Sequence, residues 1–150
     1  MINSTSSTIY TAYFKTPHEA ETAFYNAFEE ADIGRMMAVW RQVDYAECIH
    51  PLSDRLNGHK LIKESWQHIF RNSTPMRFNI VRQSTLNTGN IAVHVVYEEI
   101  YTDENDLAFV IIATNIYEQT NDGWHMVLHH ASPAPHPPAV MKTPSDCNLH

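Results

Sequence analysis

The stretch Trp124-His125-Met126-Val127-Leu128-His129-His130-Ala131-Ser132-Pro133 decides the fold that this sequence predicts. It has a strand pattern and carries a tryptophan and two adjacent histidines. Its proline ends the strand, because proline cannot continue a hydrogen-bonded ladder. Three further strands are predicted before it, over residues 77–86, 91–101 and 107–119, with short polar turns between them. The four segments together predict an antiparallel meander.

Three helices are predicted upstream of the meander. The sequence Thr16-Pro17-His18-Glu19 is typical of a helix start, because the threonine caps the end, the proline suits the first helical position and the glutamate completes a capping box. Asp32 is predicted to cap a second, shorter helix, and a third covers residues 58–71. A short strand over residues 44–49 and a polar loop over residues 53–58 precede the third helix. The expected apolar stripes are Ala20, Ala23, Phe24, Ala27, Phe28 and Ala31, then Met36, Met37 and Trp40, then Leu61, Ile62, Ser65, Trp66, Ile69 and Phe70.

Length and composition indicate one domain with one core, since the chain has 150 residues of which 43% are hydrophobic. We expect an N-terminal arm over residues 1–15, the domain over 16–133 and a proline-rich tail over 134–150. The net charge of -7 argues against nucleic-acid or anionic-membrane partners, and no apolar run is long enough to span a membrane. Cys48 and Cys147 do not suggest a structural disulfide, and the N-terminus lacks a signal-peptide pattern, so a cytoplasmic location is predicted.

The strand faces follow from closing each hairpin at its turn, since residues directly opposite share a face. One face is then bulky and aromatic and is predicted to pack under the helices, while the other is small and β-branched. The first collects Phe78, Ile80, Val93, Val95, Tyr97, Glu99, Phe109, Ile111, Asn115, Tyr117, Trp124, Met126, Leu128 and His130. The second collects Val81, Ala92, His94, Val96, Ile100, Val110, Ile112, Thr114, Ile116, Val127 and His129. A single bulge would exchange part of these sets. Three helices are too few for two apolar faces, so we predict a homodimer through the β-branched face.

The order and spacing of these elements resemble the NTF2-like α+β cone, in which three N-terminal helices pack on a curved, mainly antiparallel sheet. Within that superfamily the chain resembles the SnoaL-like, ketosteroid-isomerase-related domains, over about residues 18–135. The resemblance rests on Phe24-Tyr25-Asn26-Ala27-Phe28-Glu29 with Asp32, Trp40, Cys48-Ile49-His50-Pro51, Gly58, Ser65-Trp66, Ile69-Phe70, Ala113-Thr114-Asn115, and Gly123-Trp124 through His129-His130-Ala131-Ser132-Pro133. It implies a conical pocket between helices and sheet, and usually dimers. It implies no single reaction, because members include isomerases, cyclases, dehydratases, epoxide hydrolases and binding domains.

His130, His50 and Asn115 are the predicted catalytic residues. His130 is expected to face the helices, and a cone that closes as in relatives would bring His50 near it. Imidazole titrates near neutral pH and can take and return a proton, while the amide of Asn115 can polarise a substrate carbonyl. The alternative is that both histidines are hydrogen-bonded core residues. His129 and His94 are expected at the dimer contact.

The pocket walls are predicted to suit a small apolar or semi-polar ligand. The expected lining residues are Trp40, Trp66, Tyr97, Phe109, Trp124 and Met126. No cofactor is predicted. No metal site is predicted either, because the adjacent His129 and His130 point to opposite faces of their strand and cannot share one ion.

Two other kinds of chemistry are not favoured by the sequence. Cys48 and His50 are expected to lie about 6–7 Å apart along the strand, too far for the imidazole to activate the thiol. Asp44, Glu47 and Glu99 are expected to be solvated edge residues. The catalytic tyrosine and paired aspartates of the isomerases do not map onto this chain, which argues against steroid isomerisation.

The sequence therefore predicts a small-molecule-binding domain with an apolar pocket. The alternative is a lyase- or isomerase-type enzyme that uses His130 or His50 as acid and base on a small hydrophobic carbonyl compound. A third hypothesis is an association module whose cone is filled by side chains.

Overall fold

A computed structural model of the chain describes residues 11–102 and 106–135. Most of the expected arm, and the expected tail beyond residue 135, lie outside these ranges. The elements are, in order, α1 (Pro17–Glu30), α2 (Ile33–Val39), β1 (Glu47–Ile49), β2 (Leu56–Asn57), α3 (His59–Asn72), β3 (Arg77–Thr88), β4 (Ile91–Tyr101), β5 (Leu107–Thr120) and β6 (Gly123–Pro133). The fold is α+β, with three helices and a mixed, mainly antiparallel sheet, as predicted.

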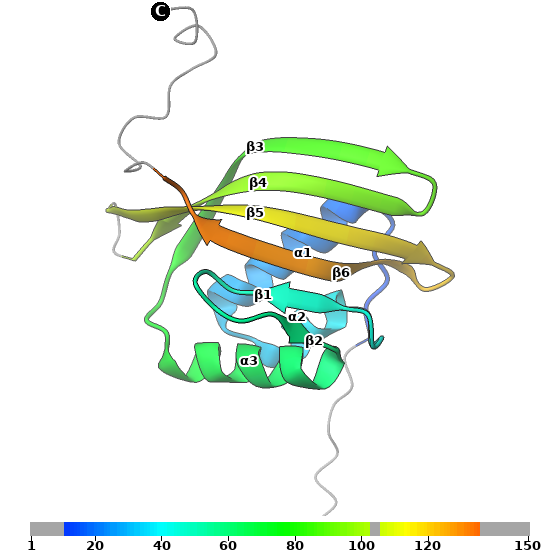
Figure 1. Cartoon of the computed structure of the whole chain (residues 1–150), viewed down its shortest axis with the longest axis horizontal. Helices are drawn as coiled ribbons and strands as arrows, with labels where there is room; N and C mark the ends of the chain where they lie inside the picture. The colour runs from blue at the N-terminus through cyan, green and yellow to red at the C-terminus, as the bar shows by residue number, and fades with distance from the viewer. Residues whose placement is uncertain (1–10, 103–105, 136–150) are drawn as a thin grey trace, which may run out of the picture.

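The six strands form one curved sheet in the order β2-β1-β6-β5-β4-β3 (Figure 1). All neighbouring strands are antiparallel except β1 and β6, which run parallel. Helix α1 runs behind the sheet in this view and contacts β3, β5 and β6. Helix α2 contacts both α1 and α3, so the three helices form a layer on one face of the sheet.

The helix ends follow the chemistry expected from the sequence. Thr16 Oγ1 accepts a hydrogen bond from the Glu19 amide at 3.1 Å. The Glu19 carboxylate reaches back to the amide of Lys15 at 2.8 Å, one residue before the predicted partner. Asp32 caps α2 through the amide of Arg35 at 3.0 Å. One element was missed: β2 lies inside the predicted polar loop and pairs with β1.

The register of β4 corrects the predicted faces. Tyr101 pairs with Leu107 as predicted, but the next pair is Ile100 with Phe109, which shifts every following pair by one residue. The face of β4 that lies under the helices therefore carries the residues at even positions, which are buried, and the predicted assignment of this strand was wrong. These residues are Ala92, His94, Val96, Glu98 and Ile100.

A second bulge corrects the closing strand. Tyr117 pairs with Met126, but Ile116 pairs with Leu128, so Val127 has no partner on β5. Beyond this extra residue the strand faces are exchanged. His129 is 2% exposed and lies under the helices, whereas His130 is exposed on the outer face. The predicted orientations of these two histidines were wrong for this reason.

None of the helices within the described ranges is long and apolar enough to cross a membrane. The core lies between the three helices and the inner face of the sheet. Its largest fully buried side chains include Trp66, Tyr117, Phe24 and Met36.

Candidate functional site

A buried carboxylate on α1 is the centre of a polar network inside the domain. Glu21 is 3% exposed, and its Oε2 accepts hydrogen bonds from His94 Nδ1 at 2.9 Å, Tyr117 OH at 3.0 Å and Asn115 Nδ2 at 3.3 Å. Gln83 donates to the other carboxylate oxygen. A buried carboxylate is costly unless donors surround it, and here strands β3, β4 and β5 supply them.

Asn115 joins the two halves of this network. Its Nδ2 donates to Glu21 and to Tyr25 OH at 3.0 Å, and its Oδ1 accepts from His129 Nδ1 at 2.6 Å. Because the amide nitrogen points at two acceptors, the side-chain oxygen must face His129. His129 therefore carries its proton on Nδ1, and its Nε2 is left as an acceptor. Asn115 is fully buried and, in this geometry, orients His129.

A second buried carboxylate lies on β4. Tyr25 OH donates to Glu98 Oε2 at 2.6 Å, and Glu98 is 3% exposed. Burial raises the pKa of Glu98 to about 7; the nearby charge of Glu21 adds to the rise, and the bond from Tyr25 opposes it. Burial also raises the pKa of Tyr25. A carboxyl group with this pKa can exchange a proton near neutral pH.

His50 and His129 form the histidine pair inside the domain, with ring centroids 6.5 Å apart. Ser65 Oγ donates to the Ile62 carbonyl at 2.7 Å, so it accepts from His50 Nε2 at 3.0 Å. Burial lowers the pKa of His50 to about 4 and that of His129 to about 3, the latter also through nearby histidine charges. Two imidazoles do approach each other, as predicted for His50, but the partner is His129 and not His130. Both are neutral near pH 7.

Cys48 lies much closer to His50 than predicted. Its Sγ is 3.6 Å from Nε2 and 4.0 Å from Nδ1 of the imidazole. The expected separation was wrong because β1 ends at Ile49, so the side chain of His50 no longer follows the alternation of the strand. Burial raises the pKa of the Cys48 thiol far above its usual range. The thiol stays protonated, and the pair has no nucleophile.

The predicted lining residues separate into two groups. Trp40, Trp66, Trp124 and Met126 are buried. Trp66 lies in an aromatic cluster with Phe24, Phe28, Phe70 and His50, with centroid separations of 4.8–5.6 Å. Tyr97 lies on the outer face, opposite Ile112, and Phe109 is 51% exposed. The one-residue shift at the start of the β4–β5 hairpin explains why Tyr97 does not line the interior, whereas Phe109 pairs with the buried Ile100 and is exposed near the end of its strand.

Sequence reasoning missed the carboxylates Glu21 and Glu98 and the hydroxyl group of Tyr25. A signal for two of them was present in α1. Glu21, Phe24, Tyr25 and Phe28 follow the i, i+3, i+4, i+7 spacing of a buried helix face. Two polar residues on such a face indicate a buried polar site. Glu98 gave no comparable signal, because both faces of its strand are apolar.

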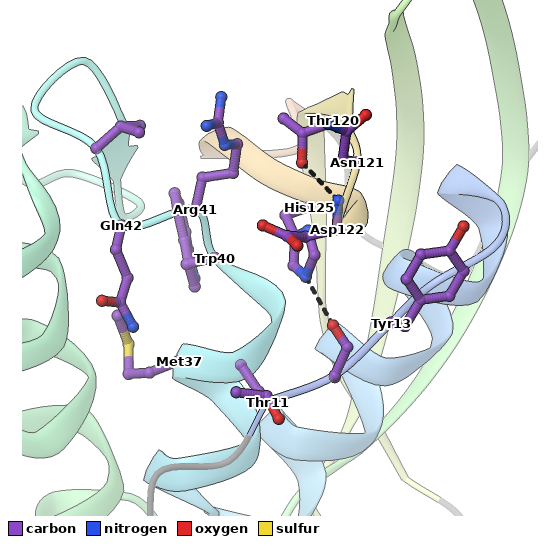
Figure 2. Close-up of a pocket in the computed structure, with 13 residues that line it drawn as sticks. Thr11, Tyr13, Met37, Trp40, Arg41, Gln42, Thr120, Asn121, Asp122 and His125 are labelled. Atoms are coloured by element: carbon purple, nitrogen blue, oxygen red, sulfur yellow. Dashed lines mark hydrogen bonds between the residues drawn. The ribbon is translucent and has the colours of Figure 1, made fainter.

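An open pocket lies next to the end of α2 and the β5–β6 hairpin (Figure 2). It has a volume of about 620 Å³ and is formed by the end of α2 with the residues after it, the β5–β6 hairpin and residues 11–13. Its lining residues are Thr11, Ala12, Tyr13, Met37, Ala38, Trp40, Arg41, Gln42, Val43, Thr120, Asn121, Asp122 and His125. Trp40 is 3% exposed, and no group in the described ranges accepts a hydrogen bond from its Nε1. Of the predicted lining residues, this pocket contains Trp40.

Comparison with known proteins decides the family. The sequence profile of the SnoaL-like domain matches residues 18–137. The chain belongs to the SnoaL-like domain family. This confirms the predicted family, and solved structures confirm the NTF2-like fold.

Three relatives place this SnoaL-like domain more closely. A proposed calcium/calmodulin-dependent protein kinase type II association domain from Thiobacillus denitrificans is 37% identical, with 82% of this chain and 98% of that chain covered and a TM-score of 0.79. A proposed dehydratase of the NTF2-like family from Streptomyces avermitilis is 29% identical, with 78% and 92% covered and a TM-score of 0.70. F-box protein SKIP8 of Arabidopsis thaliana is 29% identical over 111 residues, which is 74% of this chain. The SnoaL-like domain spans 46% of the length of that protein.

The described part of the SnoaL-like domain contains no group of three or more side chains able to hold a metal ion. It offers two arrangements with chemical potential. The interior network holds the carboxylates of Glu21 and Glu98 with His94 and His129, and the open pocket has a mixed polar lining that includes Trp40, whose indole N–H is buried without an acceptor in the described ranges.

Proposed function

We propose that this SnoaL-like domain binds a small, semi-polar organic molecule in the open pocket beside Trp40, without converting it. The observation that carries the proposal is the open pocket that Trp40 lines, together with the Trp40 indole N–H, a buried donor without an acceptor in the described structure. An unpaired buried donor costs about 1–3 kcal/mol, so a ligand oxygen that accepts from it recovers part of that free energy. The pocket volume of about 620 Å³ suits such a molecule. The polar lining favours a ligand with carbonyl or hydroxyl groups.

Replacing Trp40 with phenylalanine tests this proposal, because the aromatic wall remains and only the N–H donor is lost. A library of small carbonyl and hydroxyl compounds is first screened against the native protein by ligand-observed NMR. For a compound that binds, we expect Trp40→Phe to raise the dissociation constant about fivefold to tenfold, because one hydrogen bond to the ligand is lost. Titration calorimetry measures this change.

Trp66→Phe is the matched control for this experiment. It also removes a buried indole N–H without a partner, but Trp66 does not line the pocket. We expect its ligand affinity to equal that of the native protein. The proposal would be contradicted if Trp40→Phe bound the ligand as tightly as the native protein does. It would also be contradicted if Trp40→Phe and Trp66→Phe lost the same amount of ligand affinity.

The alternative function is a lyase or isomerase, and one observation favours it. Glu98, with a pKa raised to about 7, can take and return a proton at neutral pH beside the hydroxyl group of Tyr25. The predicted bases fit less well, because His130 is exposed on the outer face, and burial lowers the pKa of His50 to about 4 while its Nε2 donates to Ser65. An enzyme of this type would lose turnover of a carbonyl compound in Glu98→Gln while keeping affinity for it. A native protein that converts none of its ligands excludes this function.

We also propose a homodimer through the outer face of β4, β5 and β6. The helices cover the inner face, while the outer face carries partly exposed apolar side chains in adjacent rows. These are Val93, Val95, Tyr97, Ile112, Ile116 and Leu128, and the polar Thr114 lies among them. Apolar sheet faces of this kind are typical of subunit contacts. The relative from Thiobacillus denitrificans is described as an association domain, which supports a role of this fold in self-assembly.

A charged residue in this face should separate the subunits. We expect the native protein to sediment as a dimer at micromolar concentration and Ile112→Glu to sediment as a monomer, because a carboxylate would be buried without a partner. Leu61→Glu is the control, since Leu61 is 47% exposed on α3, away from the face. A native protein that is monomeric in sedimentation equilibrium would refute the proposed dimer.

A further inference from the structure

Residues 11–14 form a short segment, here called the strap, that is fixed to the beginning of β6. The amide of Trp124 donates to the carbonyl of Phe14 at 2.9 Å. His125 Nε2 donates to the carbonyl of Ala12 at 2.9 Å, the lower dashed line in Figure 2. The rings of Phe14 and His125 also meet edge-on, with centroids 5.6 Å apart. Two consecutive residues of β6 therefore hold the strap.

Gly123 makes this close approach possible. A Cβ atom at this position would lie 2.7 Å from the Phe14 carbonyl oxygen and 3.0 Å from the Phe14 nitrogen. Both are backbone atoms, which cannot move aside as the end of a side chain can. The glycine also has a φ of +95°, a conformation that other residues rarely adopt. Any side chain at Gly123 would push the strap away from β6.

The strap is one wall of the open pocket. Thr11, Ala12 and Tyr13 all line the pocket, and Figure 2 shows Thr11 and Tyr13 across it from Gln42. Tyr13 is 64% exposed, so the strap is held mainly by its backbone and by Phe14. Removing the strap would open this side of the pocket to solvent.

The strap lies outside the part of the chain that matches the family. The SnoaL-like match begins at residue 18, whereas the strap ends at residue 14. The remaining walls of the pocket, which include Met37 and Trp40, come from the shared domain. This wall therefore lies outside the part of the chain that the family profile matches.

We propose that the strap determines which ligands the pocket accepts and how fast they leave. The inference rests on the proposed binding function. In this proposal the pocket wall that contains Trp40 binds an oxygen atom of the ligand. The strap forms another wall of the same pocket and limits the size of the ligand. The ligand class is thus a compact carbonyl or hydroxyl compound, and larger analogues are excluded by the wall that residues 11–13 provide.

Attachment of the strap is measured first, without any ligand. Hydrogen–deuterium exchange of the Trp124 amide reports it directly, because this amide donates to Phe14. We expect Gly123→Ala to raise the exchange rate at least about tenfold, which corresponds to about 1.4 kcal/mol of lost protection. Gly89→Ala is the control, since Gly89 also has a positive φ, +60°, but nothing lies within 4 Å of the added Cβ. Unchanged exchange in Gly123→Ala would overturn the inference.

Closure of the pocket is measured next by acrylamide quenching of Trp40 fluorescence, with Trp66 and Trp124 replaced by phenylalanine. We expect stronger quenching after Gly123→Ala and no change after Gly89→Ala. His125→Phe provides a second route, because it keeps the ring beside Phe14 but removes the bond to Ala12. A released strap that leaves Trp40 equally protected would overturn the inference.

Ligand selectivity is measured last, with a carbonyl compound that binds the native protein and a larger analogue that does not. We expect Gly123→Ala to release the first about tenfold faster and to bind the second, whereas Gly89→Ala behaves as the native protein. Unchanged dissociation and selectivity with a released strap would overturn the inference. If no compound binds while quenching of Trp40 still rises, the strap is confirmed as a pocket wall and it is the proposed binding function that fails.

Discussion

Replacing Glu98 with glutamine should stabilise the protein by about 3 kcal/mol at about pH 8, and by almost nothing at about pH 4. Burial raises the pKa of Glu98 from 4.5 to about 7, and each pKa unit corresponds to about 1.4 kcal/mol. Glutamine is neutral at every pH, and its side-chain oxygen can still accept from Tyr25. The variant therefore avoids the cost of an ionised, buried carboxylate.

The direction of this pH dependence follows from the raised pKa. Between pH 4.5 and about 7 the unfolded chain has already lost the Glu98 proton while the folded protein keeps it. The stabilisation present below pH 4.5 is therefore lost as the pH rises through that window. His50 and His129 act in the opposite sense, because their lowered pKa values destabilise the folded state as the pH falls below 6.5. The difference between variant and native protein isolates Glu98 from these histidines.

Urea unfolding of both proteins at several pH values between about 4 and 8 measures this difference. Glu99→Gln is the control, since Glu99 lies one residue further on the outer face, partly exposed and bonded to Asn79 Nδ2 at 2.7 Å. We expect the control to show no such pH dependence. A difference between Glu98→Gln and native protein that stays constant with pH would show that Glu98 does not titrate in this range.

Replacing Asn115 with leucine should lower the free energy of unfolding by about 3–5 kcal/mol. The change keeps the volume but removes two hydrogen bonds to buried oxygens, each worth about 0.5–1.5 kcal/mol, and leaves one buried donor of His129 without an acceptor, at a cost of about 1–3 kcal/mol. Glu21 and Tyr25 retain other partners, whereas Nδ1 of His129 loses the acceptor that fixes its tautomer.

Denaturant unfolding and nitrogen NMR of the histidine rings test this second expectation. Asn26→Leu is the control, because it makes the same substitution at an exposed position of α1, outside the network and the proposed dimer face. It should change the stability by less than about 0.5 kcal/mol. In Asn115→Leu the His129 signals should also lose the pattern of an Nδ1-protonated ring. A loss of stability below about 1 kcal/mol would show that the network does not depend on Asn115.

The order of the elements could be predicted because local chemistry determines it. Thr16 and Asp32 cap α1 and α2 as expected, since the capping bonds join residues three apart in the chain. The faces of the strands could not be predicted in the same way. On β4, alternation gives Ala92 and Val96 on one side and Val93 and Val95 on the other, so both sides look like core. The register then depends on bulges that leave no clear mark in the sequence.

The bulges change which residues face the candidate site, but they do not change the fold. A shift of one residue exchanges His130 for His129 and Glu99 for Glu98, while the sheet remains the same. The network also joins distant parts of the chain: Glu21 and Tyr117 are 96 residues apart. The resemblance to relatives placed His50 near His130, whereas the structure places it near His129, with ring centroids 6.5 Å apart. The pattern on α1 contained Glu21 and Tyr25 but was interpreted only for its apolar residues.

The position of β6 in the sheet has a consequence for how the domain is made. This strand is the last in the described part of the chain, yet it lies inside the sheet, between β1 and β5. Until β6 has been synthesised, β1 and β5 both present unpaired edges, and the inner layer lacks His129 and Met126. The nascent chain therefore cannot complete its sheet or close its core before residue 133 leaves the ribosome, and it remains open to association with other chains until then.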